Sequence, residues 1–237
     1  MARILITLTS HDRLGETGRP TGFYFDEMAA PYWALRDAGH EVGLASIAGG
    51  TPPHDPTSLA DDPAERPAAV TRFLDDAAAM AELSTTEAIA NVDPAEWDAI
   101  FLPGGHGTMW DFAPSERLAA LVSEIHAKGG VVGAVCHGPA GLVDATTPEG
   151  RPLVEGKRIA TFTDAEEAAV GLTDAMPFAL ESRLRDLGAK VESAPNFEAQ
   201  AVRDGRLVTG QNPASAPAVG DLLVEALADL RASQPAA

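Results

Sequence analysis

The sequence predicts a doubly wound α/β domain, in which a mostly parallel sheet carries helices on both faces. Short, almost wholly apolar runs alternate along the chain with amphipathic stretches of helical spacing, and several apolar runs end in glycine-rich turns. Continuous apolar strands are typical of a sheet that is covered on both faces. The chain has 237 residues, which is ample for a full core, and we expect one domain over residues 1–237.

The first half of the chain contains most of the expected parallel sheet. Its runs predict, in order, a strand at 3–8, a helix at 25–40, a strand at 41–46, a strand at 97–103, a helix at 115–129 and a strand at 130–135. Gly39 supplies the stop signal of the first helix. A further helix is expected to open between Cys136 and Pro139, directly after the last of these strands.

The second half adds shorter strands and a closing helix. Its runs predict a strand at 157–161, a helix at 176–188, and strands at 189–193, 198–205 and 206–210. Asn212 can cap the last helix, with Pro213 at the first helical position.

Residues 48–90 interrupt the alternation between the second and third of the predicted strands. They are rich in proline and aspartate and turn helical near 66–83. An insertion at this end of a sheet can form a lid over a site, and a solvated surface excursion explains the composition equally well. The sequence leaves both interpretations open.

Composition and charge exclude several classes of function. Lys and Arg number 17 against 35 for Asp and Glu, so a formal charge of −18 repels nucleic acid and anionic membranes. No apolar stretch reaches the roughly 18 residues of a membrane helix. The first ten residues lack the long apolar core of a secretory signal. The single cysteine forbids an intrachain disulfide, and a reducing cytoplasm is the expected compartment.

Cys136 stands where the apolar run 130–135 meets a Gly-Pro turn. Small residues two positions on either side, Ala134 and Gly138, suit a sharp strand-to-helix elbow that presents a nucleophile at the carboxyl end of a strand. The amides of the following helix would then lower the pKa of the thiol. The alternative is a small buried hydrophobic residue at the end of a core strand.

The turn "LPGGHGTMWDF" (102–112) follows another apolar strand, so it belongs at the same edge of the sheet. Its glycines Gly104, Gly105 and Gly107 let backbone N–H groups approach a substrate oxygen. Apart from the adjacent His137, none of the six histidines follows Cys136 in the chain. The candidate bases for the thiol are therefore the adjacent His137 and His106 of the glycine turn.

Carboxylates in two segments are candidates to orient such a base. The segment "TFTDAEEAAVG" (161–171) offers Asp164, Glu166 and Glu167 just after a predicted strand, although acidic residues also stabilise helix starts in general. Glu27 lies within a mostly apolar stretch, where a buried carboxyl could stay protonated and hydrogen-bond the sulfur or a substrate oxygen. A partly exposed glutamate at a helix start is the alternative for Glu27.

Five stretches carry a family resemblance: "TGFYFDE", "GGHGTMWDF", "AVCHGPAGL", "GRPLVEGKRIATFTDAEE" and "DGRLVTGQNPASA". Together they resemble the PfpI family of the class I glutamine-amidotransferase-like superfamily, and within it the branch of stress chaperones that are also glutathione-independent glyoxalases (glyoxalase III). The match runs from about residue 3 to residue 230. It implies a flavodoxin-like α/β/α sandwich. The segment "APNFEA" (194–199) departs from the family pattern, since it is short and lacks an expected tryptophan.

The resemblance also implies roles for individual residues. Cys136 becomes the nucleophile, His137 its base and Glu167 the third member, with Glu166 as the nearby competitor. Glu27 contacts the sulfur. The oxyanion and substrate contacts fall on Gly105, the backbone N–H of His137, and the neighbouring Gly104 and His106.

The function expected from this resemblance is conversion of methylglyoxal or a related 2-oxoaldehyde into a 2-hydroxy acid such as lactate. A deglycase or another hydrolase or hydratase of small electrophiles keeps the nucleophile and changes the substrate. A holdase chaperone with a redox-sensing cysteine is the alternative from a different class.

No metal and no cofactor is expected. The sequence lacks a phosphate-binding loop and a dinucleotide fingerprint, and no two histidines sit at a ligand spacing such as i, i+4. The expected partners are a small aldehyde, a second copy of the chain in a homodimer, and unfolded proteins if the chaperone alternative holds.

Overall fold

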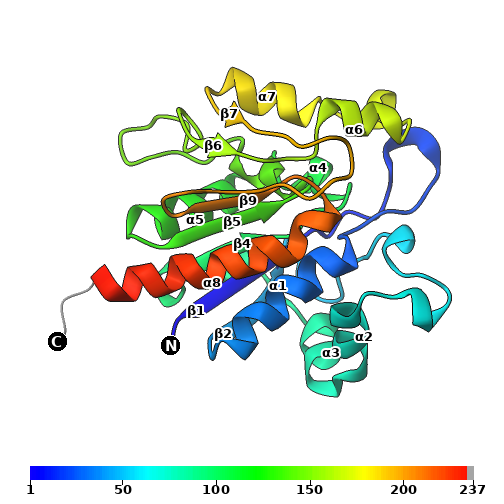
Figure 1. The fold of residues 1–237 in the computed structure, drawn as a ribbon, viewed down its shortest axis with the longest axis horizontal. Helices are drawn as coiled ribbons and strands as arrows, with labels where there is room; N and C mark the ends of the chain where they lie inside the picture. Colours follow the sequence, from blue (N-terminus) through cyan, green and yellow to red (C-terminus); the bar gives the residue numbers. More distant parts are fainter. Residues whose placement is uncertain (234–237) are drawn as a thin grey trace.

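Within residues 1–233, which the computed structural model describes, a seven-stranded sheet in the order β3-β2-β1-β4-β5-β9-β8 forms the centre of the molecule (Figure 1). The strands are β1 (Arg3–Leu8), β2 (Glu41–Ser46), β3 (Glu87–Ala88), β4 (Ala99–Leu102), β5 (Val131–Val135), β8 (Ala201–Asp204) and β9 (Leu207–Gly210). Every neighbouring pair is parallel except β8 and β9, which are antiparallel. The predicted doubly wound, mostly parallel sheet is therefore confirmed.

Helices cover both faces of the sheet. They are α1 (Phe25–Asp37), α2 (Ala68–Asp75), α3 (Ala77–Ser84), α4 (Thr108–Asp111), α5 (Glu116–Ala127), α6 (Asp164–Ala169), α7 (Leu180–Asp186) and α8 (Ala216–Ser233). Figure 1 shows α1 and α8 side by side along one face, and the two helices pack against each other. None of the helices described combines the length and the apolar character that crossing a membrane requires.

Alternation along β1 separates the two cores. Ile4 and Ile6 lie in the apolar cluster that contains the buried side chains of α1 and α8, whereas Leu5 lies in the cluster that contains those of α5 and α7. Successive side chains of a strand point to opposite faces, so each apolar run supplies both cores at once.

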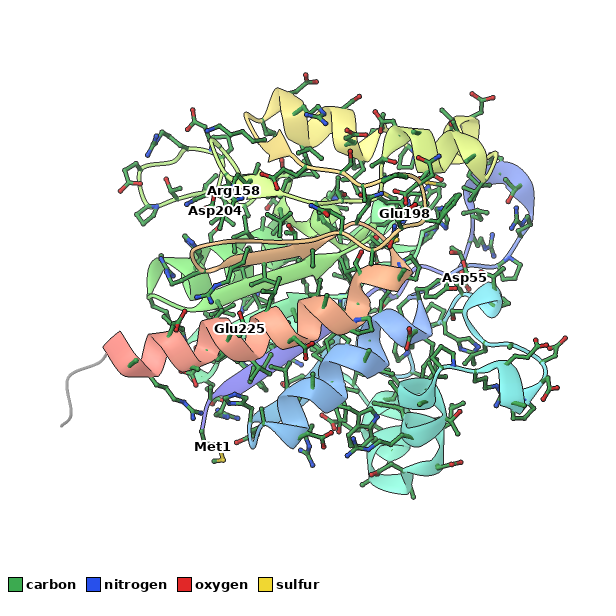
Figure 2. The ribbon with its side chains drawn as sticks, in the orientation of Figure 1. Met1, Asp55, Arg158, Glu198, Asp204 and Glu225 are labelled. Atoms are coloured by element: carbon green, nitrogen blue, oxygen red, sulfur yellow. The ribbon has the colours of Figure 1, made fainter. Side chains whose placement is uncertain are left out.

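The strands predicted at 157–161 and 189–193 pair with each other instead of joining the main sheet. They are β6 (Arg158–Ile159) and β7 (Lys190–Val191), a separate parallel pair. This pair stays beside β8 because Asp204 accepts hydrogen bonds from the backbone N–H of Arg158 at 3.0 Å and from Lys157 Nζ at 3.1 Å. Figure 2 shows Arg158 and Asp204 next to each other at this edge.

The insertion 48–90 is partly built into the core. Val70 and Phe73 of α2 are fully buried, and the ring of Phe73 meets Tyr32 of α1 edge-on, with centroids 5.0 Å apart. A purely solvated excursion would leave these side chains exposed. Residues nearer to β2, including Asp55, lie at the carboxyl ends of the strands, and a lid role for them stays a prediction.

Candidate active site

The register of β4 and β5 brings two turns together. Leu102 lies opposite Ala134, so the turn at Gly104 and Gly105 leaves the sheet beside Cys136. A Cβ on Gly104 would lie 2.6 Å from the backbone nitrogen of His137 and from the carbonyl oxygen of Val135. Only glycine fits in this position, which explains why the two turns meet without a side chain between them.

Cys136 forms a strained elbow between β5 and the next turn. Its φ is +58°, and Phe197 is the other non-glycine residue with a positive φ among residues 1–233. Such conformations cost free energy and concentrate at functional sites. A Cβ on Gly138 would lie 2.0 Å from the carbonyl oxygen of Leu102, so glycine is required there. The sharp elbow predicted from the small neighbours of Cys136 is confirmed.

The expectation of a lowered thiol pKa was wrong. The helix expected after the elbow is a five-residue 3₁₀ helix (Gly138–Leu142), and so short a helix brings little dipole to the sulfur. Cys136 is only 3% exposed, and burial raises the pKa of its thiol well above the ordinary value. The nearby Glu27 carboxyl raises this pKa further, whereas a hydrogen bond from the backbone N–H of His137 lowers it.

His137 links the sulfur to a carboxylate of α6. Its Nδ1 lies 3.3 Å from Sγ of Cys136, and its Nε2 lies 2.7 Å from Oε2 of Glu167. The other oxygen of Glu167 lies 3.0 Å from Nε2 of His106. Burial acts to raise the pKa of Glu167, but hydrogen bonds from His106 and His137 bring it down to about 2. The ionised carboxylate only accepts, so Nε2 of each histidine donates to it.

The protonation of His137 follows from this arrangement. Burial lowers the pKa of His137, and the neighbouring His106 lowers it further, so the ring is neutral at pH 7. With its proton on Nε2, the ring presents the lone pair of Nδ1 to the thiol. This is the geometry of a base that is oriented by a third group.

Glu166 and Glu167, between which the sequence left a choice, have different surroundings. The fully buried Glu166 accepts hydrogen bonds from the backbone N–H and the hydroxyl of Thr163 and forms the capping box of α6. Consecutive helical residues point about 100° apart, so only one of the two can reach His137. Glu167 is the one that does.

Glu27 is fully buried in the first turn of α1. Its Oε2 accepts the backbone N–H of Gly104 at 2.8 Å. Within the described residues Oε1 has no partner of good hydrogen-bond geometry, and the thiol of Cys136 is the other group that the carboxyl engages. Burial raises the pKa of Glu27 to about 8, although the contacts with Cys136 and Gly104 act in the opposite direction. The carboxyl is therefore mostly protonated at pH 7.

Of the three glycines in the turn, one has a free backbone donor within the described residues. Gly104 donates its N–H to Glu27, and Gly107 donates to the carbonyl oxygen of Gly22 at 3.4 Å, so neither N–H is available to a substrate oxygen as the sequence suggested. The N–H of Gly105 has no acceptor within the described residues. Its φ of +102° and the 2.3 Å that would separate a Cβ from the oxygen of Gly22 both require glycine.

A pocket of about 220 Å³ opens over Cys136, His137, Gly105 and His106. The remaining polar side chains that line it are those of Tyr24, Asp55 and Thr57. The apolar lining residues are Phe162, Val170, Phe197 and Pro213. Asp55, labelled in Figure 2, belongs to the loop after β2 and holds the hydroxyls of Thr21 and Thr57. The pocket therefore has the size and the mixed lining of a site for a small polar molecule with an apolar end.

A model of the DJ-1/PfpI family matches residues 22–226. The chain belongs to this family. The resemblance of the sequence to PfpI proteins is thereby confirmed, and the architecture of the DJ-1/PfpI proteins agrees with the observed parallel sheet and its two helical layers.

The relatives of this DJ-1/PfpI protein include named glyoxalases. The chain is 35% identical to the glutathione-independent glyoxalase HSP31 of Saccharomyces cerevisiae, over 95% of this chain and 98% of that one. It is 32% identical to glyoxalase 3 of Candida albicans, over 91% and 94%. The crystal structure of glyoxalase III from Candida albicans superposes with a TM-score of 0.87 at 31% identity, covering 95% of this chain and 97% of that chain. Rapid encystment protein 24 kDa of Francisella tularensis superposes with a TM-score of 0.90 at 35% identity, covering 96% and 99%.

Among the residues that the structure describes, one cluster of this DJ-1/PfpI protein has donor atoms close enough to hold a metal ion. It consists of His106, His137 and Glu167, whose ligand atoms lie within 4.8 Å of one another. The same atoms are already paired through hydrogen bonds, and Nδ1 of His137 faces the sulfur. A site that works without metal stays the prediction for this chain.

Sequence reasoning missed part of the pocket. Tyr24 and Asp55 come from connections whose course the hydrophobic pattern does not reveal, and Phe197 comes from the segment that departs from the family pattern. The positive φ of Phe197 leaves no trace in the sequence, because aromatic residues rarely adopt it. For Glu27, which the sequence left as either exposed or buried, the structure selects the buried alternative in this DJ-1/PfpI protein.

Proposed function

We propose that the protein is a glutathione-independent glyoxalase, which converts methylglyoxal or a related 2-oxoaldehyde and water into a 2-hydroxy acid. The observation that carries the proposal is the hydrogen-bonded series from the thiol of Cys136 through His137 to Glu167, at 3.3 and 2.7 Å. The glutathione-independent glyoxalase HSP31 of Saccharomyces cerevisiae and glyoxalase 3 of Candida albicans align over 95% and 91% of this chain.

The first step forms a hemithioacetal. The sulfur of Cys136 attacks the aldehyde carbon C1 while Nδ1 of His137 takes the thiol proton, so no free thiolate is needed beforehand. This order suits a thiol whose pKa is raised by burial. The oxygen on C1 gains negative charge and is stabilised by the N–H groups of Gly105 and His137. It then takes the proton from the imidazolium of His137, which leaves a neutral hemithioacetal and a neutral His137.

The second step moves a hydrogen between carbons. Neutral His137 removes the proton from C1 to give an enediolate, and the hydroxyl proton on the C1 oxygen shifts to the C2 oxygen. The imidazolium then returns its proton to C2, which leaves a thioester carbonyl at C1 and a neutral His137. C1 is oxidised to the thioester level while C2 is reduced from ketone to alcohol, so no external oxidant or reductant takes part. Ionised Glu167 stabilises the imidazolium, and protonated Glu27 can donate a hydrogen bond to a substrate oxygen or to the sulfur.

Hydrolysis completes the cycle. Water attacks the thioester carbon, the C–S bond breaks, and the thiol of Cys136 regains its proton as the 2-hydroxy acid leaves. Each residue thus returns to its starting protonation state.

The test is lactate formation from methylglyoxal without glutathione or added metal. We expect turnover by the wild type and its loss in Cys136→Ala, with circular dichroism showing that both are folded. A folded wild type that produces no lactate contradicts the proposal. Parallel assays with glycated amines would then identify a deglycase that uses the same thiol.

The holdase alternative has little support on the surface. The large apolar side chains exposed within the described residues are Met1, Val170 and Phe197, and the last two line the pocket. A chaperone surface would need a larger contiguous patch. A homodimer and a reducing cytoplasmic location remain part of the proposal, on the grounds given from the sequence.

A further inference from the structure

The loop 194–200 carries an aromatic ring to the mouth of the pocket in an unusual backbone conformation. Phe197 has a φ of +65°, the residue is 49% exposed, and it lines the pocket that contains Cys136. A bulky residue keeps such a conformation only where its surroundings hold it firmly. The loop must therefore be fixed by contacts on its other side.

Glu166 supplies the central contact. Its Oε1 accepts the backbone N–H of Phe197 at 2.8 Å and Nδ2 of Asn212 at 2.9 Å. Its Oε2 is occupied by the two donors of Thr163 at 3.0 Å. Four hydrogen-bond donors thus converge on the one fully buried carboxyl of Glu166. This carboxyl links α6, the loop 194–200 and the residues that lead into α8.

The two ends of the loop are tied independently. Gln211 accepts the N–H of Ala194 through Oε1 at 2.9 Å, and Ser215 accepts the N–H of Gln200 through Oγ at 3.0 Å. Asn212 also donates from Nδ2 to the carbonyl oxygen of Glu198 at 2.7 Å. The ring of Phe197 is therefore presented by a rigid loop rather than by a mobile one.

The ring completes an apolar wall next to the reacting groups. Phe162 lies 4.5 Å from the ring of His137 between centroids, and Phe197 lies 6.4 Å from Phe162. Val170, which ends α6 and is 43% exposed, lines the same pocket. The pocket is also lined by the polar side chains of Tyr24, Asp55 and Thr57.

We propose that Phe197 and Val170 form the specificity-determining wall that contacts the substituent on C2 of the aldehyde, and that Glu166 is the positioning residue that holds this wall. The inference rests on the proposed glyoxalase function. With the aldehyde carbon at Cys136, an apolar substituent gains contact area along Phe162 and Phe197, whereas a substituent larger than methyl meets the ring of Phe197. The site therefore prefers small apolar 2-oxoaldehydes.

Two substrates of different size test the wall. We would measure kcat/KM for methylglyoxal and phenylglyoxal with the wild type, Phe197→Ala and Phe197→Asn; asparagine tolerates a positive φ and so preserves the backbone. In both variants, the kcat/KM for phenylglyoxal divided by the kcat/KM for methylglyoxal should rise by about tenfold or more, which is the discrimination that a hydrophobic contact gives. Trp110→Ala removes a partly exposed aromatic ring that does not line this pocket and should leave the ratio unchanged.

Glu166→Gln tests the positioning role. The NH₂ of the new amide faces one of the two pairs of hydrogen-bond donors, so the loop 194–200 loses some of its hydrogen bonds. KM for methylglyoxal should then rise at least threefold, and kcat should change less than KM. The ratio of kcat/KM for phenylglyoxal to kcat/KM for methylglyoxal should shift as in Phe197→Ala. A merely structural role would lower the amount of folded enzyme without changing the ratio. An unchanged ratio in both Phe197 variants overturns the inference while leaving the glyoxalase function intact. No turnover of either aldehyde by the wild type overturns both.

Discussion

The buried carboxyl of Glu27 predicts a specific dependence of stability on pH. Its pKa is raised from 4.5 to about 8 in the folded protein, so between these values the folded state keeps a proton that the unfolded state releases. The free energy of unfolding therefore falls as pH rises through this window. The slope is about 1.4 kcal/mol per pH unit, and the total is about 5 kcal/mol. Below pH 4.5 both states are protonated and this loss is absent.

Glu27→Gln removes the titration and keeps an acceptor for Gly104. We would measure urea unfolding by tryptophan fluorescence at pH 5, 6, 7 and 8, with a reducing agent present. Because the other groups titrate alike in both proteins, the stability of the variant relative to the wild type should increase by about 4 kcal/mol between pH 5 and pH 8. Glu124→Gln, at an exposed position of α5, is the matched control, and its free energy of unfolding should change with pH as that of the wild type does. Parallel curves for Glu27→Gln would show that the carboxyl ionises normally, and the reasoning from burial would be refuted.

The other predictions concern the reacting groups and their support. Iodoacetamide should label Cys136 slowly in the native protein at pH 7 and rapidly after unfolding, measured by mass spectrometry, because burial raises the thiol pKa; fast native labelling contradicts this. Glu167→Gln should lower kcat by about 100-fold or more, since His137 loses the carboxylate that stabilises its protonated form, and a loss below tenfold in a folded variant argues against that role. Gly104→Ala should lower stability by about 1–3 kcal/mol in thermal melts, because its Cβ would lie 2.6 Å from backbone atoms; an unchanged melting temperature would mean that the turn can relax. The kcat/KM of the wild type should fall as pH rises through about 8, where Glu27 loses its proton, and this limb should be absent in Glu27→Gln.

Much of the fold was predictable because hydrophobic periodicity reports which segments are buried. The runs 3–8 and 41–46 coincide with β1 and β2, and the elbow at Cys136 followed from small residues around a cysteine at a strand end. Periodicity carries no information about which strands pair. The runs at 157–161 and 189–193 look like sheet strands, yet they form their own pair beside Asp204.

The electrostatics of the site were less predictable, because pKa values depend on what covers each group. Neither the desolvation of Cys136 nor its closeness to Glu27 is visible in the linear sequence, so the sign of the shift in the thiol pKa was wrong. The choice between Glu166 and Glu167 likewise depended on tertiary partners. Asn212 and the backbone N–H of Phe197 donate to the carboxyl of Glu166. The carboxyl of Glu167 is the one that contacts the two histidines.

The two adjacent glutamates of α6 constrain how the site can change during evolution. Glu166 holds the pocket wall and Glu167 holds the base, so a shift or rotation of this short helix alters reaction rate and substrate choice together. A change in substrate preference that leaves the reaction rate intact must then come from residues other than these two glutamates. The exposed side chains at 170 and 197 are the places where it can occur, and a library randomised at these two positions is the most economical route to altered selectivity.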